Sequence, residues 1–471
     1  MIALLDEISV PTRCLSEYIA EALRRPLPED VAEKARHHVL DTLAAMVSGS
    51  QLRPGRMAIG YVTALGGVPE SSIVGTPVRT SAVHAALANG MLAHADETDD
   101  SHAPSRTHPG CAIIPAALAV GERNQVSGMS FLRAVVLGYD VAARVNYALG
   151  ADAFAAAARS THSFAGVFGA GAAAAALFDL SAAQVRHVLS YCAQQASGVA
   201  CNVRDADHIE KAFDFGGMPA RGGVTAASMV AHGFSGVDDV FAGERNFLEA
   251  FAPEPDPSRL IEGLGERFEI MGTNIKKWSV GSPAQSALDA VTWLMHNEKF
   301  ATHDVSAIRV HLPTRSARTV DNAPMPDINV QHLVALLLVD GSLTFQSVHD
   351  HVRMEDPSVL ALRGRIQLLP SQELMEARPR RQAIVEIALR DGRQLSRRTI
   401  AVRGTADNPM TGAEVEAKAL DLMENVLGPR RTRTLMDACG TIERNPDISD
   451  FRRLWVAPAH EQAIDHMERL A

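Results

Sequence analysis

The first half of the chain has the apolar spacing of α-helices. After Pro28-Glu29-Asp30, a typical helix start, apolar side chains recur every three or four residues from Val31 to Val47. Similar segments follow, separated by Gly, Ser or Pro, and the pattern returns near the C-terminus. The expected helices include residues 82–95, 112–121, 131–149, 182–196, 221–232, 414–427, 430–439 and 458–470. The chain is therefore expected to be mainly α-helical.

The middle of the chain has the alternating pattern of β-strands. Residues 306–312 and 383–389 alternate apolar and polar positions, and the second segment continues through Asp391-Gly392, a hairpin signal, into 394–402. Two further segments, 329–338 and 358–367, have helical spacing.

This order predicts two domains. A large all-helical domain is expected from both ends of the chain, residues 1–260 and 406–471, with a smaller α+β lid domain inserted at 261–405. We expect a cleft between them. No repeat of fixed period indicates a solenoid.

Composition narrows the class of protein. Of the 471 residues, 46% are apolar and 21% charged, which excludes a disordered chain. A net charge of −10, the absence of a long basic run and only 5% aromatic residues argue against a nucleic-acid partner.

Cysteine content and hydropathy suggest a cytoplasmic location. The five cysteines form no CxxC pair, so neither a disulfide framework nor a zinc knuckle is expected. The N-terminus has no signal-peptide pattern, and the most apolar segment, 165–180, is shorter than the ~20 residues that span a bilayer. No membrane association is expected.

The densest group of polar side chains lies between two apolar helical segments. Residues 94–110 include His94, Glu97, Asp100, Ser101 and His108. If these acids are buried together, some of their pKa values rise, which suits acid–base catalysis. A solvated loop with Asp caps and a metal site of His and carboxylates are the alternatives, although no HExxH-type motif supports a metal.

Four other polar positions have both a chemical and a structural interpretation. His162 begins a Gly/Ala-rich helical segment, and Lys211 precedes Gly216-Gly217, where it would hold a carboxylate or lie on the surface. Lys276 opens the smaller domain, and His332 lies in an apolar helix, where a structural core histidine is the usual case.

Taken together, these segments resemble the MmgE/PrpD family, which includes 2-methylcitrate dehydratases, cis-aconitate decarboxylases and iminodisuccinate epimerases. The resemblance covers roughly residues 16–454. The motifs that carry it are Asn89-Gly90, His94-x-x-Glu97-x-Asp99-Asp100-Ser101, His108-Pro109-Gly110, His162 with Gly169, Lys211 with Gly216 and Gly222, His232-Gly233-Phe234-Ser235-Gly236, and Lys276 with Asp289. It implies a helical domain with an α+β lid, a homodimer, and no metal or other cofactor.

Several positions depart from the family pattern. Glu97, Thr98 and Ser101 stand where members commonly carry Asp, an aromatic residue and Thr. The usual Lys-x-x-His is Lys211-x-x-Asp214. The usual Lys-x-Tyr-Pro segment is Lys276-Lys277-Trp278-Ser279, Gln285 replaces a frequent His, and His332 replaces a site Tyr.

The resemblance also implies roles for individual residues. His108 and His162 are the candidate proton carriers, and the sequence leaves open which is base and which is acid. Lys211 and Lys276 would hold substrate carboxylates and stabilise the charge formed on them. Glu97 and Asp100 are expected to orient the histidines or act as acid, Ser101 to hydrogen-bond the substrate, and His332 to close the pocket.

These roles predict a cofactor-independent hydro-lyase that acts on a small polycarboxylate by removing a proton next to a carboxylate. An epimerase or a decarboxylase on a di- or tricarboxylate is the alternative within the family. A non-catalytic carboxylate-binding helical protein is the alternative of another class.

Overall fold

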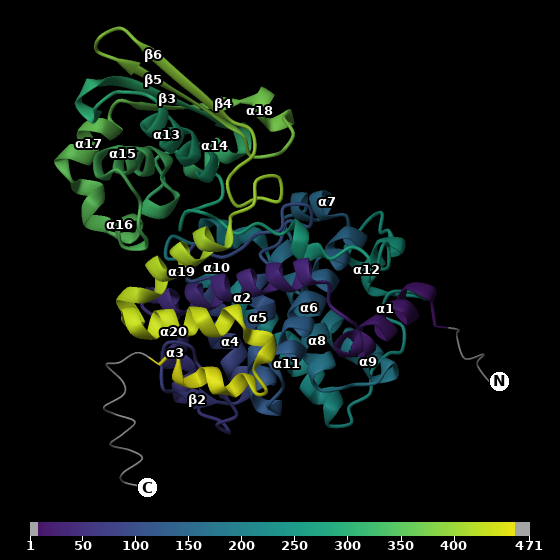
Figure 1. Cartoon of the computed structure of the whole chain (residues 1–471). Helices are drawn as coiled ribbons and strands as arrows, with labels where there is room; N and C mark the ends of the chain where they lie inside the picture. Colours follow the sequence, from purple (N-terminus) through teal and green to yellow (C-terminus); the bar gives the residue numbers. More distant parts are fainter. Residues whose placement is uncertain (1–7, 457–471) are drawn as a thin grey trace. The chain divides into compact units, whose positions relative to one another are not determined.

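The computed structural model describes residues 8–456. The chain forms two compact units: unit 1 is Met1–Thr273 with Leu422–Ala471, and unit 2 is Asn274–Asp421 (Figure 1). The domain limits expected from the sequence, 260/261 and 405/406, stay predictions beside these units.

The described residues of unit 1 form helices and one very short antiparallel strand pair, β1 (Ser71–Ser72) and β2 (Arg79–Thr80). Its helices are α1 (Val10–Glu21), α2 (Glu29–Gly49), α3 (Arg53–Leu65), α4 (Ala82–Ala93), α5 (Gly110–Asn124), α6 (Gly128–Leu149), α7 (Ala151–Ala156), α8 (Thr161–Leu177), α9 (Ala182–Gln195), α10 (Ile209–Ala212), α11 (Met218–Ala231), α12 (Phe247–Phe251) and α20 (Pro429–Gly440). The helix α19 (Gly412–Leu427) crosses the limit between the units.

These helices confirm the helical segments expected from the apolar spacing, with ends that differ by a few residues. The expected helix at 458–470 lies outside the described residues. Within residues 8–456, no helix combines the length and the apolar character needed to cross a membrane.

Helix α8 lies at the centre of unit 1. It packs against α5, α6 and α11 (Figure 1). Its Ala- and Gly-rich sequence is apolar on all sides, and every residue except His162 is buried. Small side chains let neighbouring helices approach closely, and His162 lies in the first turn of this closely packed helix.

A π-helical turn, Phe213–Gly217, joins α10 to α11. It packs closely against α4 at two glycines: a Cβ on Gly216 would lie 2.0 Å from the carbonyl oxygen of Gly90. A side chain at this position would therefore push the two segments apart. π-Helical turns are rare in proteins, and many of those that occur lie at functional sites. This one carries Phe215.

Unit 2 combines a four-stranded sheet with helices. Its strands are β3 (Val305–Pro313), β4 (Ile366–Ser371), β5 (Ala383–Leu389) and β6 (Gln394–Thr399). Its helices are α13 (Gln285–Asn297), α14 (Thr314–Val320), α15 (Val330–Asp340), α16 (Phe345–His349), α17 (Pro357–Arg363) and α18 (Gln372–Glu376). The strand order is β4-β3-β5-β6; β3 and β4 are parallel, and the other two pairs are antiparallel.

The core of unit 2 lies between the sheet and the helices α13 and α15. Strand β5 alternates buried and half-buried positions, as its sequence predicts. The prediction of a helix over 358–367 is wrong at the C-terminal end. α17 stops at Arg363, and Ile366 already belongs to β4. A short apolar run does not distinguish helix from strand, and pairing with β3 decides the outcome here.

Candidate active site

The acid-rich segment between α4 and α5 lies inside unit 1. Every residue from His94 to His102 is buried. α4 ends where His94 leaves the helical conformation, and the backbone N–H of His102 donates to the carbonyl of Thr107 at 2.8 Å. The alternative of a solvated loop is therefore wrong.

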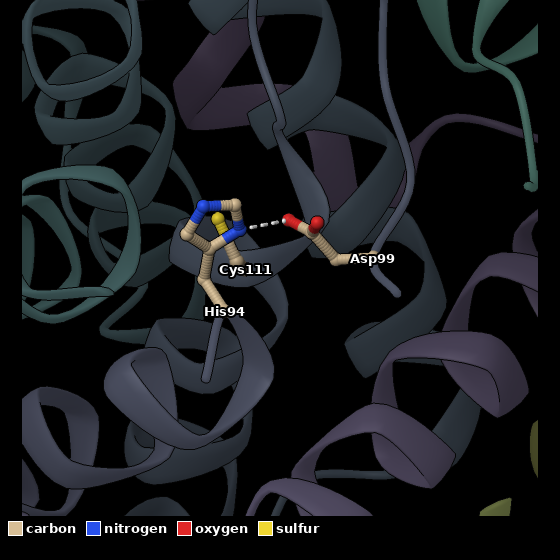
Figure 2. Close-up of side chains that lie close together, drawn as sticks. All are labelled: His94, Asp99 and Cys111. Carbon is tan, nitrogen blue, oxygen red and sulfur yellow. Dashed lines mark hydrogen bonds and ion pairs between the residues drawn. The ribbon is translucent and has the colours of Figure 1, made fainter. Parts of the chain in front are cut away.

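Asp99 connects two histidines. Its carboxylate accepts hydrogen bonds from Nδ1 of His94 at 2.9 Å and Nδ1 of His108 at 3.0 Å; Figure 2 shows the first of these, with Cys111 beside the ring of His94. Because an ionised carboxylate only accepts hydrogen bonds, both rings carry their proton on Nδ1. Each neutral ring then presents an unprotonated Nε2, and Asp99 stabilises the charge when Nε2 takes up a proton.

Three histidine rings lie around the side chain of Phe215. His162 stacks on it with ring centroids 3.5 Å apart, and His94 stacks on it at 4.4 Å. Two rings that stack at these distances on one aromatic ring must occupy its opposite faces. The ring of His108 lies 5.2 Å from that of His162 and 5.3 Å from that of His94. The arrangement brings His108 and His162 close enough to act on one small molecule.

His162 is kept neutral. Its position follows from the start of α8, where the Ser160 hydroxyl accepts the backbone N–H of Ser163. Burial lowers the pKa of His162 well below its usual range, and the neighbouring His108, His94 and Lys211 lower it further. Its Nδ1 is buried and has no hydrogen-bond partner among the described residues.

Lys211 and Glu97 form an ion pair beside the histidine rings and Phe215. The ammonium of Lys211 forms an ion pair with the carboxylate of Glu97, and it lies 5.3 Å from the centroid of Phe215. The Lys211 side chain is 20% exposed and that of Glu97 is 9% exposed. Lys211 is therefore partly buried beside this group, and its binding of a substrate carboxylate stays a prediction.

Asp100 faces a different set of partners. It accepts hydrogen bonds from Nδ1 of His38 at 2.7 Å, from the hydroxyl of Tyr139 at 2.5 Å and from the backbone N–H of Gly110 at 3.0 Å. Burial raises the pKa of Asp100, but the hydrogen bonds from His38 and Tyr139 outweigh it, so the pKa is lowered. Through Gly110, Asp100 holds the start of α5, two residues after His108.

Three further predicted site residues are Ser101, Lys276 and His332. The hydroxyl of Ser101 is buried and makes no hydrogen bond to the described residues. Lys276 and His332 belong to unit 2, where both are buried. Both ring nitrogens of His332 lack hydrogen-bond partners within the described chain, and burial lowers its pKa to about 4, with Arg363 and Arg353 adding to the shift.

The structure therefore brings together His108, His162, Glu97 and Lys211. No role was expected from the sequence for Asp99, Phe215 or His208. Asp99 and Asp100 are adjacent acids in one irregular segment, and no spacing rule distinguishes them. His208 lies next to His94, with ring centroids 5.0 Å apart.

Asp214, which stands where the family commonly has a histidine, is also part of this region. It accepts hydrogen bonds from the Ser160 hydroxyl at 2.5 Å and the Asn202 amide at 2.7 Å. Burial raises the pKa of Asp214 to about 6, although these hydrogen bonds oppose the shift.

Comparison with known proteins supports the sequence resemblance. Residues 13–260 match the model of the MmgE/PrpD N-terminal domain, and residues 278–441 match that of the C-terminal domain. The chain is 25% identical to a cis-aconitate decarboxylase-like protein of Aspergillus oryzae, over 93% of this chain and 96% of that protein. It is 24% identical to human cis-aconitate decarboxylase, over 92% of each chain, and 22% identical to that of Aspergillus terreus, over 93% and 94%. The chain is thus an enzyme of the MmgE/PrpD family.

Proposed function

We propose that the protein is a lyase that moves a proton at the carbon next to a carboxylate of a small polycarboxylate, and that it does so as a hydro-lyase. The observation that carries the proposal is the Asp99–His108 pair beside neutral His162 and the ammonium of Lys211. This set provides a proton acceptor and a cation. It needs no cofactor to move the proton.

The proton-transfer step begins at His108. Nε2 of His108 takes the proton from the carbon, and Asp99 stabilises the imidazolium that results. The C–H electron pair forms the new C=C bond as the C–O bond of the leaving hydroxyl breaks. The imidazolium returns its proton to that hydroxyl, which departs as water, and His108 is restored.

Cations stabilise the charge that develops on the substrate carboxylate during this step. Lys211 gives up its ion pair with Glu97 and binds the substrate carboxylate instead. Its ammonium acts as a point charge with three N–H donors. Neutral His162 and the buried hydroxyl of Ser101 offer hydrogen bonds to the substrate. Asp100 holds the backbone beside His108 in place.

The remaining roles are proposed from the family resemblance. Lys276 is assigned a second substrate carboxylate and His332 the closure of the pocket. A homodimer is expected from the same resemblance, and a cytoplasmic location is expected from the sequence.

Decarboxylation is the second candidate reaction, because the relatives described above are named cis-aconitate decarboxylases or similar to them. In that reaction the C–CO2 bond breaks in place of C–O. An imidazolium at His108 then protonates the resulting carbanion. The same residues serve both reactions, so the product distinguishes them.

A proton NMR screen in deuterated buffer tests the proposal. Citrate, 2-methylcitrate, cis-aconitate, malate and amino-dicarboxylates are each mixed with the protein or its His162→Ala/Lys211→Ala variant. Loss of a C–H signal with a new vinyl resonance and no CO2 supports the hydro-lyase. A vinyl product with CO2 supports the decarboxylase, and exchange without either indicates an epimerase. Binding without any exchange overturns the proposal in favour of a non-catalytic binding protein.

A further inference from the structure

Two buried histidine nitrogens beside the Glu97–Lys211 pair have no hydrogen-bond partner among residues 8–456. Nε2 of His94 and Nε2 of His208 are enclosed, and none of the described residues bonds to either. The two residues are 0% and 4% exposed, and their ring centroids lie 5.0 Å apart. Buried side-chain nitrogens almost always have a partner, so two unpartnered atoms at one place point to a ligand from outside the chain.

Glu97 completes a set of three donors. One ligand atom from each of His94, Glu97 and His208 lies within 4.8 Å of the other two. A point central to three such atoms lies at most about 2.8 Å from each, whereas zinc binds imidazole nitrogen and carboxylate oxygen at about 2.0–2.2 Å. Side-chain movements of less than about 1 Å would close the difference.

The two rings are already oriented for a metal. Asp99 accepts the Nδ1–H of His94, which leaves Nε2 as the ligand atom and reproduces the carboxylate–histidine arrangement found behind metal-bound histidines. His208 is held at the start of α10 with a left-handed backbone, φ +60°. Such conformations in residues other than glycine concentrate at functional sites.

We propose that His94, Glu97 and His208 form a Zn²⁺ site, and that Zn²⁺ competes with Lys211 for Glu97. Two imidazoles and one carboxylate are a common zinc set that leaves a fourth position open. Lys211 is partly exposed, so its ammonium can turn away as the ion binds.

Zinc binding therefore turns the enzyme off. Zn²⁺ displaces the Lys211 ammonium from Glu97. The ion itself is then a cation next to the Asp99–His108 pair. This inhibition rests on the proposed function, whereas the binding itself does not.

A second group of donors, His94 with Asp99 and Cys111, is less suitable (Figure 2). Both oxygens of Asp99 already accept hydrogen bonds from His94 and His108. The Cys111 thiol donates to the carbonyl of His108 at 3.1 Å. Metal binding there would break all three interactions.

Isothermal titration of the chelator-treated 471-residue chain with ZnCl2 tests the site. We expect one saturable site in the wild type and no comparable site for MgCl2, because magnesium prefers oxygen ligands. His208→Gln should weaken zinc binding at least tenfold. The matched control His232→Gln, at the exposed end of α11, should leave it unchanged.

A further variant separates the site from general damage to the fold. Lys211→Met removes the competitor for Glu97, so it should bind zinc more tightly than the wild type. Absence of saturable zinc binding, or equal affinity in the wild type and His208→Gln, overturns the proposal.

Activity gives a separate readout. Zinc should inhibit the wild type but not His208→Gln, when each is compared with its own rate without zinc. If no substrate is turned over at all, the proposed function fails while the binding experiment still decides the zinc site.

Discussion

Replacing Asp99 with asparagine changes two hydrogen bonds and almost no volume. The carboxylate accepts from Nδ1 of both His94 and His108. An asparagine offers one acceptor and one donor, so it can accept from only one of the rings. The ring that faces the new NH2 group must take the other tautomer, with its proton on Nε2.

The size of the effect depends on which ring faces the oxygen. If His108 faces the NH2 group, its Nε2 is protonated and cannot accept a proton, which costs up to about 10⁴-fold in kcat. If His108 faces the oxygen, it keeps a neutral hydrogen bond and loses the charge-assisted part, about 1–2 kcal/mol, which is roughly 5–30-fold. We therefore expect kcat to fall by at least about fivefold, with little change in KM.

The assay is the steady-state rate on the polycarboxylate identified by the NMR screen. Asp238→Asn, an exposed position, serves as the matched control and should keep wild-type kcat. In the double variant Asp99→Asn/His108→Gln, the loss should not exceed that of His108→Gln alone, because the two residues act as one unit. A folded Asp99→Asn variant with wild-type kcat would refute this account of His108.

Three further perturbations have defined outcomes. Lys211→Ala removes the cation beside Glu97 and should lower kcat/KM by about 10–100-fold, measured by initial rates. Gly216→Ala places a methyl group against the carbonyl of Gly90 and should cost about 3 kcal/mol in the free energy of unfolding, measured with urea. Burial raises the pKa of Asp140 to about 7, although the Glu269 N–H opposes the shift, so the folded state retains a proton that the unfolded state loses near pH 4. Relative to Asp140→Asn, the wild type should lose about 4 kcal/mol of stability as the pH rises from 4 to 7 and then level off; parallel curves would contradict this.

Much of the candidate site could be predicted from residue type and order. His108, His162, Glu97 and Lys211 stand in motifs with recognisable spacing, and the structure groups them. The role of orienting the histidines was expected for Asp100 and not for Asp99, although residue order does not show in which direction adjacent side chains of an irregular segment point. Asp99 faces His94 and His108, whereas Asp100 faces His38 and Tyr139.

The parts of the fold that escaped prediction depend on contacts between distant segments. The π-helical turn that carries Phe215 requires the close approach of Gly216 to Gly90, more than 100 residues earlier. Strand β4 is set by its pairing with β3, and it contains Pro370, which an edge strand tolerates. Local spacing contains neither kind of information.

The central claim is that His108 moves a proton at the carbon next to a carboxylate. The direct measurement is the rate of deuterium exchange from solvent into the substrate, followed by proton NMR for the wild type and for His108→Gln. We predict exchange in the wild type and a loss of at least about 100-fold in a folded His108→Gln variant. Exchange at the wild-type rate in His108→Gln would contradict the account.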